Sequence, residues 1–195
     1  GKNVLPMATS QDHKRVGDAD TGPNTGGMGA YSPAPVVTAD VHQRVMDEVI
    51  YPTVRGMAAE GNVYTGFLYA GLMIDKAGKP KVIEFNCRFG DPETQPIMVR
   101  LESSLVLLVE AALAKALNKV EATWDPRPTV GVVLAAGGYP ADYAKGDVIE
   151  GLDAAAELDG KVFHAGTALN AAGEVVTAGG RVLCATAIGR TVEEA

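Results

Sequence analysis

The chain has 195 residues, of which 47% are hydrophobic and 21% are charged, so it can bury a full core and is not disordered as a whole. Its formal net charge is −7, its Lys and Arg residues are scattered, and 6% of its residues are aromatic. These values argue against a nucleic-acid-binding platform, and no apolar run approaches the roughly 18 residues that a membrane span needs. The two cysteines form no CxxC pair and no signal peptide is visible, so we expect a cytoplasmic protein.

Both ends of the sequence resemble interrupted elements. Gly1 is followed by a turn-like pair and then by Val4–Ala8, which has the composition of a strand, so we expect the second arm of a hairpin. At the other end, Thr191 and Glu194 have the spacing of a helix capping box. We therefore expect a piece of a longer polypeptide.

A polar, glycine-rich segment from Ser10 to about Pro35 follows and is predicted as a long loop. Four glycines within Asp20–Gly29 would let the backbone approach a phosphate or a carboxylate and donate N–H groups to it. For the glycines alone an ordinary surface loop is the favoured interpretation, since they match neither the P-loop nor the dinucleotide fingerprint. Charges of both signs strengthen the functional interpretation, because they suit a zwitterionic or phosphorylated substrate; they belong to Asp12, Lys14, Arg15 and Asp20.

The next elements are a helix and a hairpin. Thr38 can cap a helix that runs to about Glu60, with a kink at Pro52. The strands Thr65–Asp75 and Pro80–Asn86 flank a four-residue turn and should pair in antiparallel fashion.

A second helix is predicted from Pro92 or Glu93 to about Leu117. Its N-terminus would favour an anion. The Pro-rich stretch 124–128 then marks a boundary between two domains, 1–123 and 128–195. The second domain should be β-rich, with strands at Val130–Ala136, Lys161–Ala165, Glu174–Thr177 and Arg181–Ala187. The expected fold class is α+β.

The most informative motif lies at the end of the hairpin. Alternation along a strand places Glu84, Asn86 and Arg88 on one face. The opposite face should be apolar and buried; it carries Ile83, Phe85 and Cys87. A carboxylate and an amide oxygen suit Mg²⁺ or Mn²⁺, and a guanidinium two residues on can bind the same polyphosphate. On this motif alone, a half-buried edge strand with a solvated face is an equally good interpretation.

Nucleophilic catalysis has little support. A lone histidine in a polar loop, such as His13, is more often solvated or hydrogen-bonded than a general base. Cys87 and Cys184 both lie in apolar strands, where buried free thiols are the favoured interpretation.

Several segments together resemble the phosphoribosylamine-glycine ligases of the ATP-grasp superfamily. They are DHKR (12–15), DTGPNTGGMGAYSP (20–33), IEFNCRFGDPETQ (83–95), VGVVLAAGGYP (130–140), KGDVIEGL (145–152), HAGT (164–167) and GGRVLCATA (179–187). The resemblance covers effectively the whole chain. It implies the C-terminal part of an ATP-grasp domain, with an antiparallel sheet and flanking helices, followed by a small β-rich domain. It also implies ATP-dependent ligation of glycine to 5-phosphoribosylamine in purine biosynthesis, through glycyl phosphate, with release of ADP and phosphate.

The resemblance assigns roles to individual residues. Glu84 and Asn86 match the metal-binding pair for Mg²⁺ or Mn²⁺, and Arg88 matches the catalytic arginine expected to hold the ATP phosphates and the acyl phosphate. The pocket for glycine and the ribosylamine phosphate would draw on Asp12, Lys14, Asp20, Asn24, Gly26, Gly27, Asp91, Pro92, Glu93 and Thr94.

One position departs from the wider superfamily. Many ATP-grasp enzymes place a further acidic metal ligand about twelve residues before the E-x-N glutamate, where this chain has Leu72. Asp75 is a possible substitute. The resemblance also implies N-terminal and lid domains that precede Gly1 in the full-length chain and supply the adenine pocket, so the fragment alone should be inactive. Two alternatives stay open: a non-catalytic nucleotide-binding or interaction module, and another ATP-grasp carboxylate-amine ligase.

Overall fold

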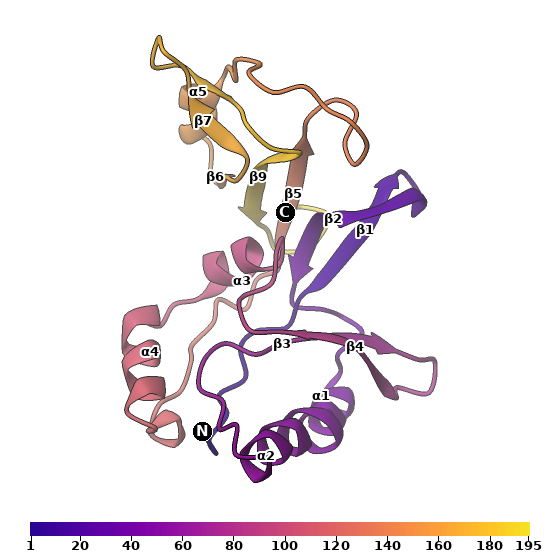
Figure 1. Cartoon of the computed structure of the whole chain (residues 1–195), viewed down its shortest axis with the longest axis vertical. Helices are drawn as coiled ribbons and strands as arrows, with labels where there is room; N and C mark the ends of the chain where they lie inside the picture. Colours follow the sequence, from indigo (N-terminus) through magenta and orange to yellow (C-terminus); the bar gives the residue numbers. More distant parts are fainter. The chain divides into compact units, whose positions relative to one another are not determined.

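The computed structural model describes residues 1–195 and divides into two compact units, each assembled from segments that are separated in the sequence (Figure 1). Unit 1 comprises Gly1–Thr9, Ala34–Gly90 and Leu101–Asp125; unit 2 comprises Ser10–Pro33, Asp91–Arg100 and Pro126–Ala195. The predicted domains, 1–123 and 128–195, are continuous stretches of sequence, whereas these units are groups of residues in mutual contact. The predicted division into two domains therefore stays a prediction. The α+β class is confirmed, with antiparallel sheets and short helices. No helix is both long enough and apolar enough to span a bilayer.

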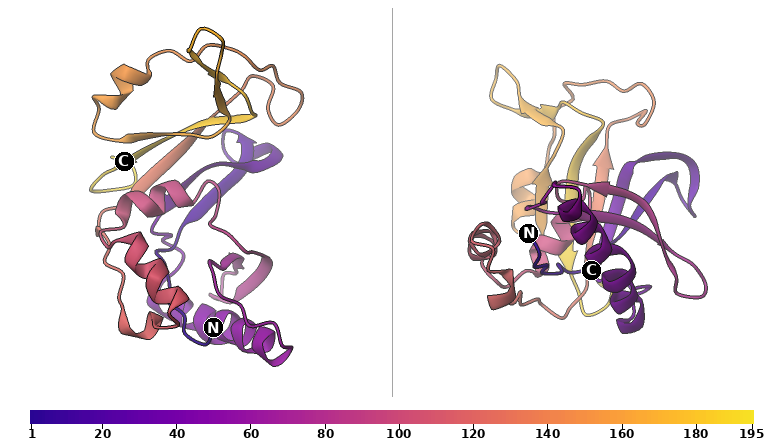
Figure 2. Two further views of the ribbon diagram at one scale, coloured as in Figure 1. Left: turned by 60° about the vertical axis from the view of Figure 1, so that its left-hand side comes forward. Right: turned by 60° about the horizontal axis from the view of Figure 1, so that its bottom comes forward.

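Unit 2 is built on a five-stranded antiparallel sheet (Figures 1 and 2). Its strands, in spatial order, are β1 (Gln11–Gly17), β2 (Thr21–Ser32), β5 (Thr129–Ala135), β9 (Arg181–Ile188) and β6 (Lys161–His164). β2 pairs directly with β5, although about a hundred residues separate them in the chain. This pairing is what places the glycine-rich segment in the same unit as the C-terminal strands.

Helix α3 (Thr94–Arg100) packs on β2, β5 and β9. Thr129 and Val133 of β5 are buried, with Gly131 between them. A Cβ added at Gly131 would lie 3.3 Å from Cδ of Pro96, so the absence of a side chain lets the helix lie close to the strand. Arg100, also buried, donates from Nη1 to Oγ of Ser32 over 2.8 Å and ties the end of the helix to β2.

The remaining part of unit 2 confirms the predicted β-rich pattern. The four strands predicted beyond residue 128 correspond to β5, β6, β8 (Val175–Thr177) and β9, each within a residue or so of its expected ends. Strand β7 (Thr167–Leu169), which pairs with β8, and helix α5 (Leu152–Ala156) were not predicted. A small core forms around Ala136, Val182 and Leu183.

The predicted loop from Ser10 to Pro35 is wrong, because these residues form the β1–β2 hairpin. The turn residues Ala19 and Asp20 have φ values of 55° and 59°, the left-handed region that hairpin turns require. A Cβ added at Gly29 would lie 2.6 Å from the Gly131 carbonyl oxygen of β5. The glycine there permits close pairing of strands, whereas glycine composition usually indicates a loop.

The helical segment of unit 1 confirms the prediction from Thr38 onward. It runs through α1 (Ala39–Val45), a π-helical turn η1 (Met46–Ile50) and α2 (Tyr51–Ala59), which appear as one rod in Figure 2. Thr38 Oγ1 accepts a hydrogen bond from the Val41 N–H, as an N-cap does. Pro52 has no N–H to donate to the carbonyl four residues earlier, and the widened turn lies at that point. Gly61, with φ of 82°, ends the segment.

The predicted hairpin of unit 1 is also confirmed. β3 (Tyr69–Ile74) and β4 (Pro80–Asn86) pair in antiparallel fashion, with a bulge between Gly71 and Leu72. In the turn, Oδ1 of Asp75 accepts hydrogen bonds of 2.9 Å from the N–H groups of Ala77 and Lys79. Asp75 therefore fixes the turn through an Asx-type arrangement.

Two elements predicted from the sequence differ in the structure. The single helix from Pro92 to Leu117 is divided into α3, α4 (Leu105–Leu113) and the 3₁₀ turn η2 (Leu117–Lys119). The chain leaves the helical path at Glu102 and Ser103, which both bond to Thr123. The Glu102 N–H donates to the Thr123 carbonyl, and Ser103 Oγ accepts from the Thr123 N–H. Ser104 then caps α4. Serine side chains that bond to the backbone favour such breaks. Val4–Ala8 is no strand.

Gly27 offers a test of the packing in unit 2. Its φ is 119°, and an added Cβ would collide with the ring of Pro92. We expect Gly27→Ala to lower the free energy of unfolding by about 2 kcal/mol or more. Gly56 of α2 is the matched control, because an added Cβ there meets nothing within 4 Å. Gly56→Ala should stabilise by roughly 0.5–1 kcal/mol, and urea denaturation measures both; equal effects would contradict the packing described.

Asp75 offers a test by titration. The Lys79 N–H, followed by the Ala77 N–H and the charges of Lys81 and Arg44, lowers the pKa of Asp75 below its ordinary 3.8 despite some desolvation. Because folding lowers this pKa, the stabilisation is complete above 3.8 and is lost as the pH falls through the folded value. An NMR titration of the carboxyl carbon should give a midpoint below 3.8. In Asp75→Asn the amide signals of residues 77 and 79 should lose this transition; a wild-type midpoint at or above 3.8 would contradict the turn geometry.

Candidate functional site

The predicted metal-binding pair lies at the C-terminal end of β4 in unit 1. Glu84 is opposite Gly71 in the register and Asn86 is opposite Tyr69, so the two polar side chains share one face of the hairpin. Glu84 is exposed, whereas Asn86 is half-buried and its Nδ2 makes no hydrogen bond. The carboxylate is therefore open to a ligand, and the amide beside it retains hydrogen-bonding capacity.

Arg88 follows after the strand has ended. It is exposed, and Nη1 donates to the Phe89 carbonyl over 2.7 Å, which leaves most of its five N–H donors available. The Phe89 ring stacks on Phe67 with a centroid distance of 3.8 Å. Tyr64 donates to the Phe67 carbonyl over 2.5 Å; burial, together with the nearby Cys87 thiol, raises the pKa of Tyr64. The segment that carries Arg88 is thus packed, through Phe89, against Phe67, which lies two residues before β3.

The expected burial of the opposite face is wrong. Ile83 is 64% exposed and Phe85 is 39% exposed, and Cys87 is exposed as well. The β3–β4 hairpin is a two-stranded sheet, and such a sheet has too little surface of its own to cover both faces. Cys184 is buried, as predicted, and burial raises the pKa of its thiol.

The metal donors near this hairpin are few. No group of three or more His, Cys, Asp or Glu side chains could hold an ion. Asp75, considered as a substitute for the ligand missing at Leu72, instead uses Oδ1 in the turn and lies 3.9 Å from the Lys81 ammonium through Oδ2. Glu84 and Asn86 are thus two hard oxygen donors, a set that fits Mg²⁺ when phosphate oxygens and water complete its octahedron.

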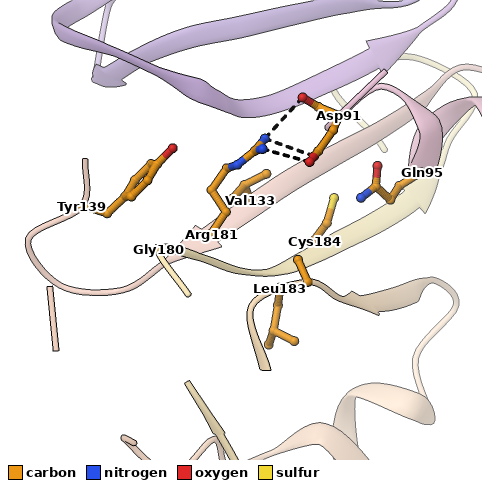
Figure 3. Close-up of a pocket in the computed structure, with 9 residues that line it drawn as sticks. Asp91, Gln95, Val133, Tyr139, Gly180, Arg181, Leu183 and Cys184 are labelled. Carbon is orange, nitrogen blue, oxygen red and sulfur yellow. Dashed lines mark hydrogen bonds and ion pairs between the residues drawn. The ribbon is translucent and has the colours of Figure 1, made fainter. Parts of the chain in front are cut away.

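A second group of predicted residues meets in unit 2 around Arg181 (Figure 3). The Arg181 guanidinium binds both carboxylate oxygens of Asp91, at 3.0 Å from Nη1 and 2.8 Å from Nη2. Nη1 also reaches the carbonyl oxygens of Gly26 at 2.9 Å, Gly27 at 3.4 Å and Asp91 at 3.3 Å. A single cation therefore joins the start of β9, the glycine-rich strand and the turn before α3.

Tyr139 holds the same glycine from its other side. The Gly26 N–H donates to Tyr139 Oη over 3.0 Å, so both polar groups of this residue have partners. Gly180 passes under Tyr139, and a Cβ added there would collide with the ring. Glycine at position 180, directly before Arg181, is thus required by the close packing of Tyr139, whereas an added Cβ at Gly179 would lie 3.0 Å from Cα of Gly166.

A cavity of about 270 Å³ opens beside this group within unit 2 (Figure 3). Its lining includes Asp91, Gln95, Tyr139, Arg181, Leu183 and Cys184. Oε1 of Gln95 is buried and makes no hydrogen bond. The cavity combines the Asp91–Arg181 ion pair with an apolar wall, a combination found in sites for small polar ligands.

The structure brings together some of the predicted substrate residues and separates others. Asp91, Gly26, Gly27 and Pro92 meet around Arg181, with the Pro92 ring against Gly27. Glu93 is buried, and Thr94 begins α3.

The remaining candidates lie on the exposed hairpin. Asp12 and Lys14 form an ion pair of 3.7 Å on β1. Asp20 is in the turn, and Asn24 pairs opposite Arg15. These candidates of the hairpin do not join the group around Arg181 in any contact that the structure shows.

Sequence analysis missed Arg181, Tyr139 and Gln95. Each lies in a segment interpreted only as a strand, a turn or a helix start. The glycine pair directly before Arg181 was the one available signal, since consecutive glycines next to an arginine mark a close backbone approach beside a charge.

Comparison with known proteins places this geometry in a family. Residues 1–94 match the family model described as phosphoribosylglycinamide synthetase, ATP-grasp (A) domain, and residues 129–195 match the C domain of the same synthetase. The chain is 88% identical to the phosphoribosylamine–glycine ligase of Pseudomonas aeruginosa and 75% identical to that of Vibrio cholerae. All of the chain is aligned in both comparisons, and it spans 45% of each relative's length.

A solved structure supports the same relationship. The crystal structure of phosphoribosylamine–glycine ligase from Thermotoga maritima superposes with a TM-score of 0.84 at 37% identity, covering 100% of this chain and 47% of that one. Two domain models from one synthetase thus match in order, and the fold agrees over the full chain. The chain belongs to the phosphoribosylglycinamide synthetase family.

Proposed function

We propose that the full-length protein ligates glycine to 5-phosphoribosylamine with cleavage of ATP to ADP and phosphate, a step of purine biosynthesis. The observation that carries the proposal is the placement of Glu84 and Asn86 on one face at the end of β4, directly before an exposed Arg88. Relatives that align with the whole chain are named for this ligation. Since the chain spans 45% of their length, the proposal concerns the whole protein and not these 195 residues alone. A cytoplasmic location belongs to the same proposal.

The metal and phosphate residues lie in unit 1. Glu84 and Asn86 would hold Mg²⁺ or Mn²⁺ together with phosphate oxygens, and Arg88 would bind the transferred phosphoryl group. The metal, when bound, neutralises charge on the ATP phosphates. Arg88 lowers the repulsion between the carboxylate and the γ-phosphate, because a guanidinium donates paired hydrogen bonds to phosphoryl oxygens.

The reaction needs no protein nucleophile. A carboxylate oxygen of glycine attacks the γ-phosphorus and ADP leaves, which gives glycyl phosphate. The amine nitrogen of 5-phosphoribosylamine then attacks the carbonyl carbon, and phosphate leaves with the former carboxylate oxygen. This chemistry relies on alignment and charge neutralisation. It gives no covalent step to Cys87, which is exposed, or to Cys184, which is buried.

The substrate residues lie in unit 2. We assign the cavity beside Asp91 and Arg181 to the small substrates, with Gly26, Gly27, Pro92, Glu93 and Thr94 forming or supporting its wall. A volume of about 270 Å³ suits a ligand of a few heavy atoms. The proposed substrate residues also include four on the β1–β2 hairpin: Asp12, Lys14, Asp20 and Asn24.

Substitution of Glu84 tests the proposal in the full-length protein. Glu84→Ala should lower glycine-dependent ADP formation at least about 100-fold, because loss of a metal ligand removes several kcal/mol of charge stabilisation. Glu84→Gln should retain the side-chain shape and still lose most of the activity. A coupled ADP assay measures both.

Glu121→Ala is the matched control, since Glu121 is an exposed glutamate of unit 1 outside any helix or strand. It should retain wild-type turnover. Unchanged turnover of Glu84→Ala at saturating Mg²⁺ would contradict the assignment of the metal site. If the 195 residues alone bound Mg-ATP tightly in a calorimetric titration, a nucleotide-binding module would be favoured instead.

A further inference from the structure

Arg181 makes more polar contacts than any other side chain near the cavity, and all of them are to protein groups. Its guanidinium spans both oxygens of the Asp91 carboxylate and three backbone carbonyls. The side chain is 23% exposed, whereas that of Asp91 is 56% exposed. The cation is therefore enclosed by its acceptors, and the carboxylate that it holds faces outward.

This arrangement differs from an anion site. An arginine that receives a phosphate needs free N–H donors. Nη1 of Arg181 is already directed at Asp91 and at the glycine-rich strand and Nη2 donates to Asp91, so only Nε–H and the second N–H of Nη2 remain. The charge of Arg181 is also balanced by Asp91. Arg88 of unit 1, which donates one hydrogen bond to the Phe89 carbonyl, retains the donors that a phosphate requires.

The carboxylate has acceptor capacity left. A carboxylate offers about four lone-pair positions, and the paired bonds from Arg181 use one on each oxygen. The remaining positions, on an exposed side chain at the edge of the cavity, suit an amine or ammonium donor.

We propose that Arg181 is a positioning residue that orients the Asp91 carboxylate to receive the amino group of a substrate. The position of the Arg181 guanidinium is fixed by a further contact, because it also donates to the Gly26 carbonyl. Gly26 is itself held in place, since its N–H donates to Tyr139 Oη. Gly26 lies close against the guanidinium, because an added Cβ would lie 3.0 Å from the guanidinium carbon and would require the Arg181 side chain to shift. This inference rests on the proposed function and adds a residue that does not touch the substrate.

Kinetics of the full-length Arg181→Lys variant test the inference. Lysine keeps the charge but cannot bind both carboxylate oxygens and the carbonyls in one plane. We expect KM for one amino substrate to rise about tenfold or more, with KM for ATP within about twofold of wild type. A rise confined to glycine identifies glycine as the partner of Asp91, and a rise confined to phosphoribosylamine identifies that amine.

Two further variants provide a matched control and an independent test of the same contact. Arg190→Lys is the matched control, because Arg190 is 85% exposed and pairs only with Glu194 in the same unit; its kinetics should be unchanged. Asp91→Asn retains an acceptor for Arg181 and should raise the same KM even if Arg181→Lys folds poorly.

The outcomes separate the two proposals. If wild-type full-length protein forms no ADP in response to glycine, the proposed function fails. If wild type is active but Arg181→Lys and Asp91→Asn leave the KM values of both amines unchanged, the positioning role is overturned. An equal rise in all three KM values, ATP included, also overturns it, because a general structural defect would then explain the effect.

Discussion

The guanidinium of Arg181 is the interaction on which the arrangement of the residues around the cavity of unit 2 depends. It joins β9 to the Asp91 turn and to the glycine-rich strand β2, segments that lie far apart in the sequence. Hydrogen bonds from a charged donor are stronger than those between neutral groups, and a planar fork fixes direction as well as distance. Two glycines permit this approach: Gly26 lies against the guanidinium and Gly27 against Pro92. The glycine-rich sequence thus serves packing around a cation.

Local signals predicted the parts of the fold that are stabilised locally. The cap at Thr38, the stop at Gly61, the hairpin at Asp75 and the C-terminal strands all follow from short-range patterns. The β1–β2 hairpin did not, because its glycines have low strand propensity and the pairing of β2 with β5 at Gly29 is a contact between segments far apart in the sequence. The break between α3 and α4 likewise depends on Thr123, a residue about twenty positions away.

The candidate site was predicted unevenly, for a physical reason. Glu84, Asn86 and Arg88 form a compact motif whose residue types suit a metal and a phosphate, so the sequence predicts that role, with a solvated edge strand as the equally good alternative for the motif alone. The Arg181 group is assembled by tertiary contacts, and an arginine at a strand start carries no signal of its partners. The burial expected for Ile83 and Phe85 failed because burial depends on what covers a strand, which alternation does not reveal.

The central claim is that this family member activates the carboxylate of its amino acid by phosphorylation, with Glu84 and Asn86 on the metal and Arg88 on the phosphoryl group. Transfer of oxygen isotope tests it most directly. With glycine labelled by ¹⁸O in its carboxylate, the full-length protein should place one labelled oxygen in each phosphate released, since the attacking oxygen leaves with phosphorus. Turnover that releases unlabelled phosphate would contradict the account.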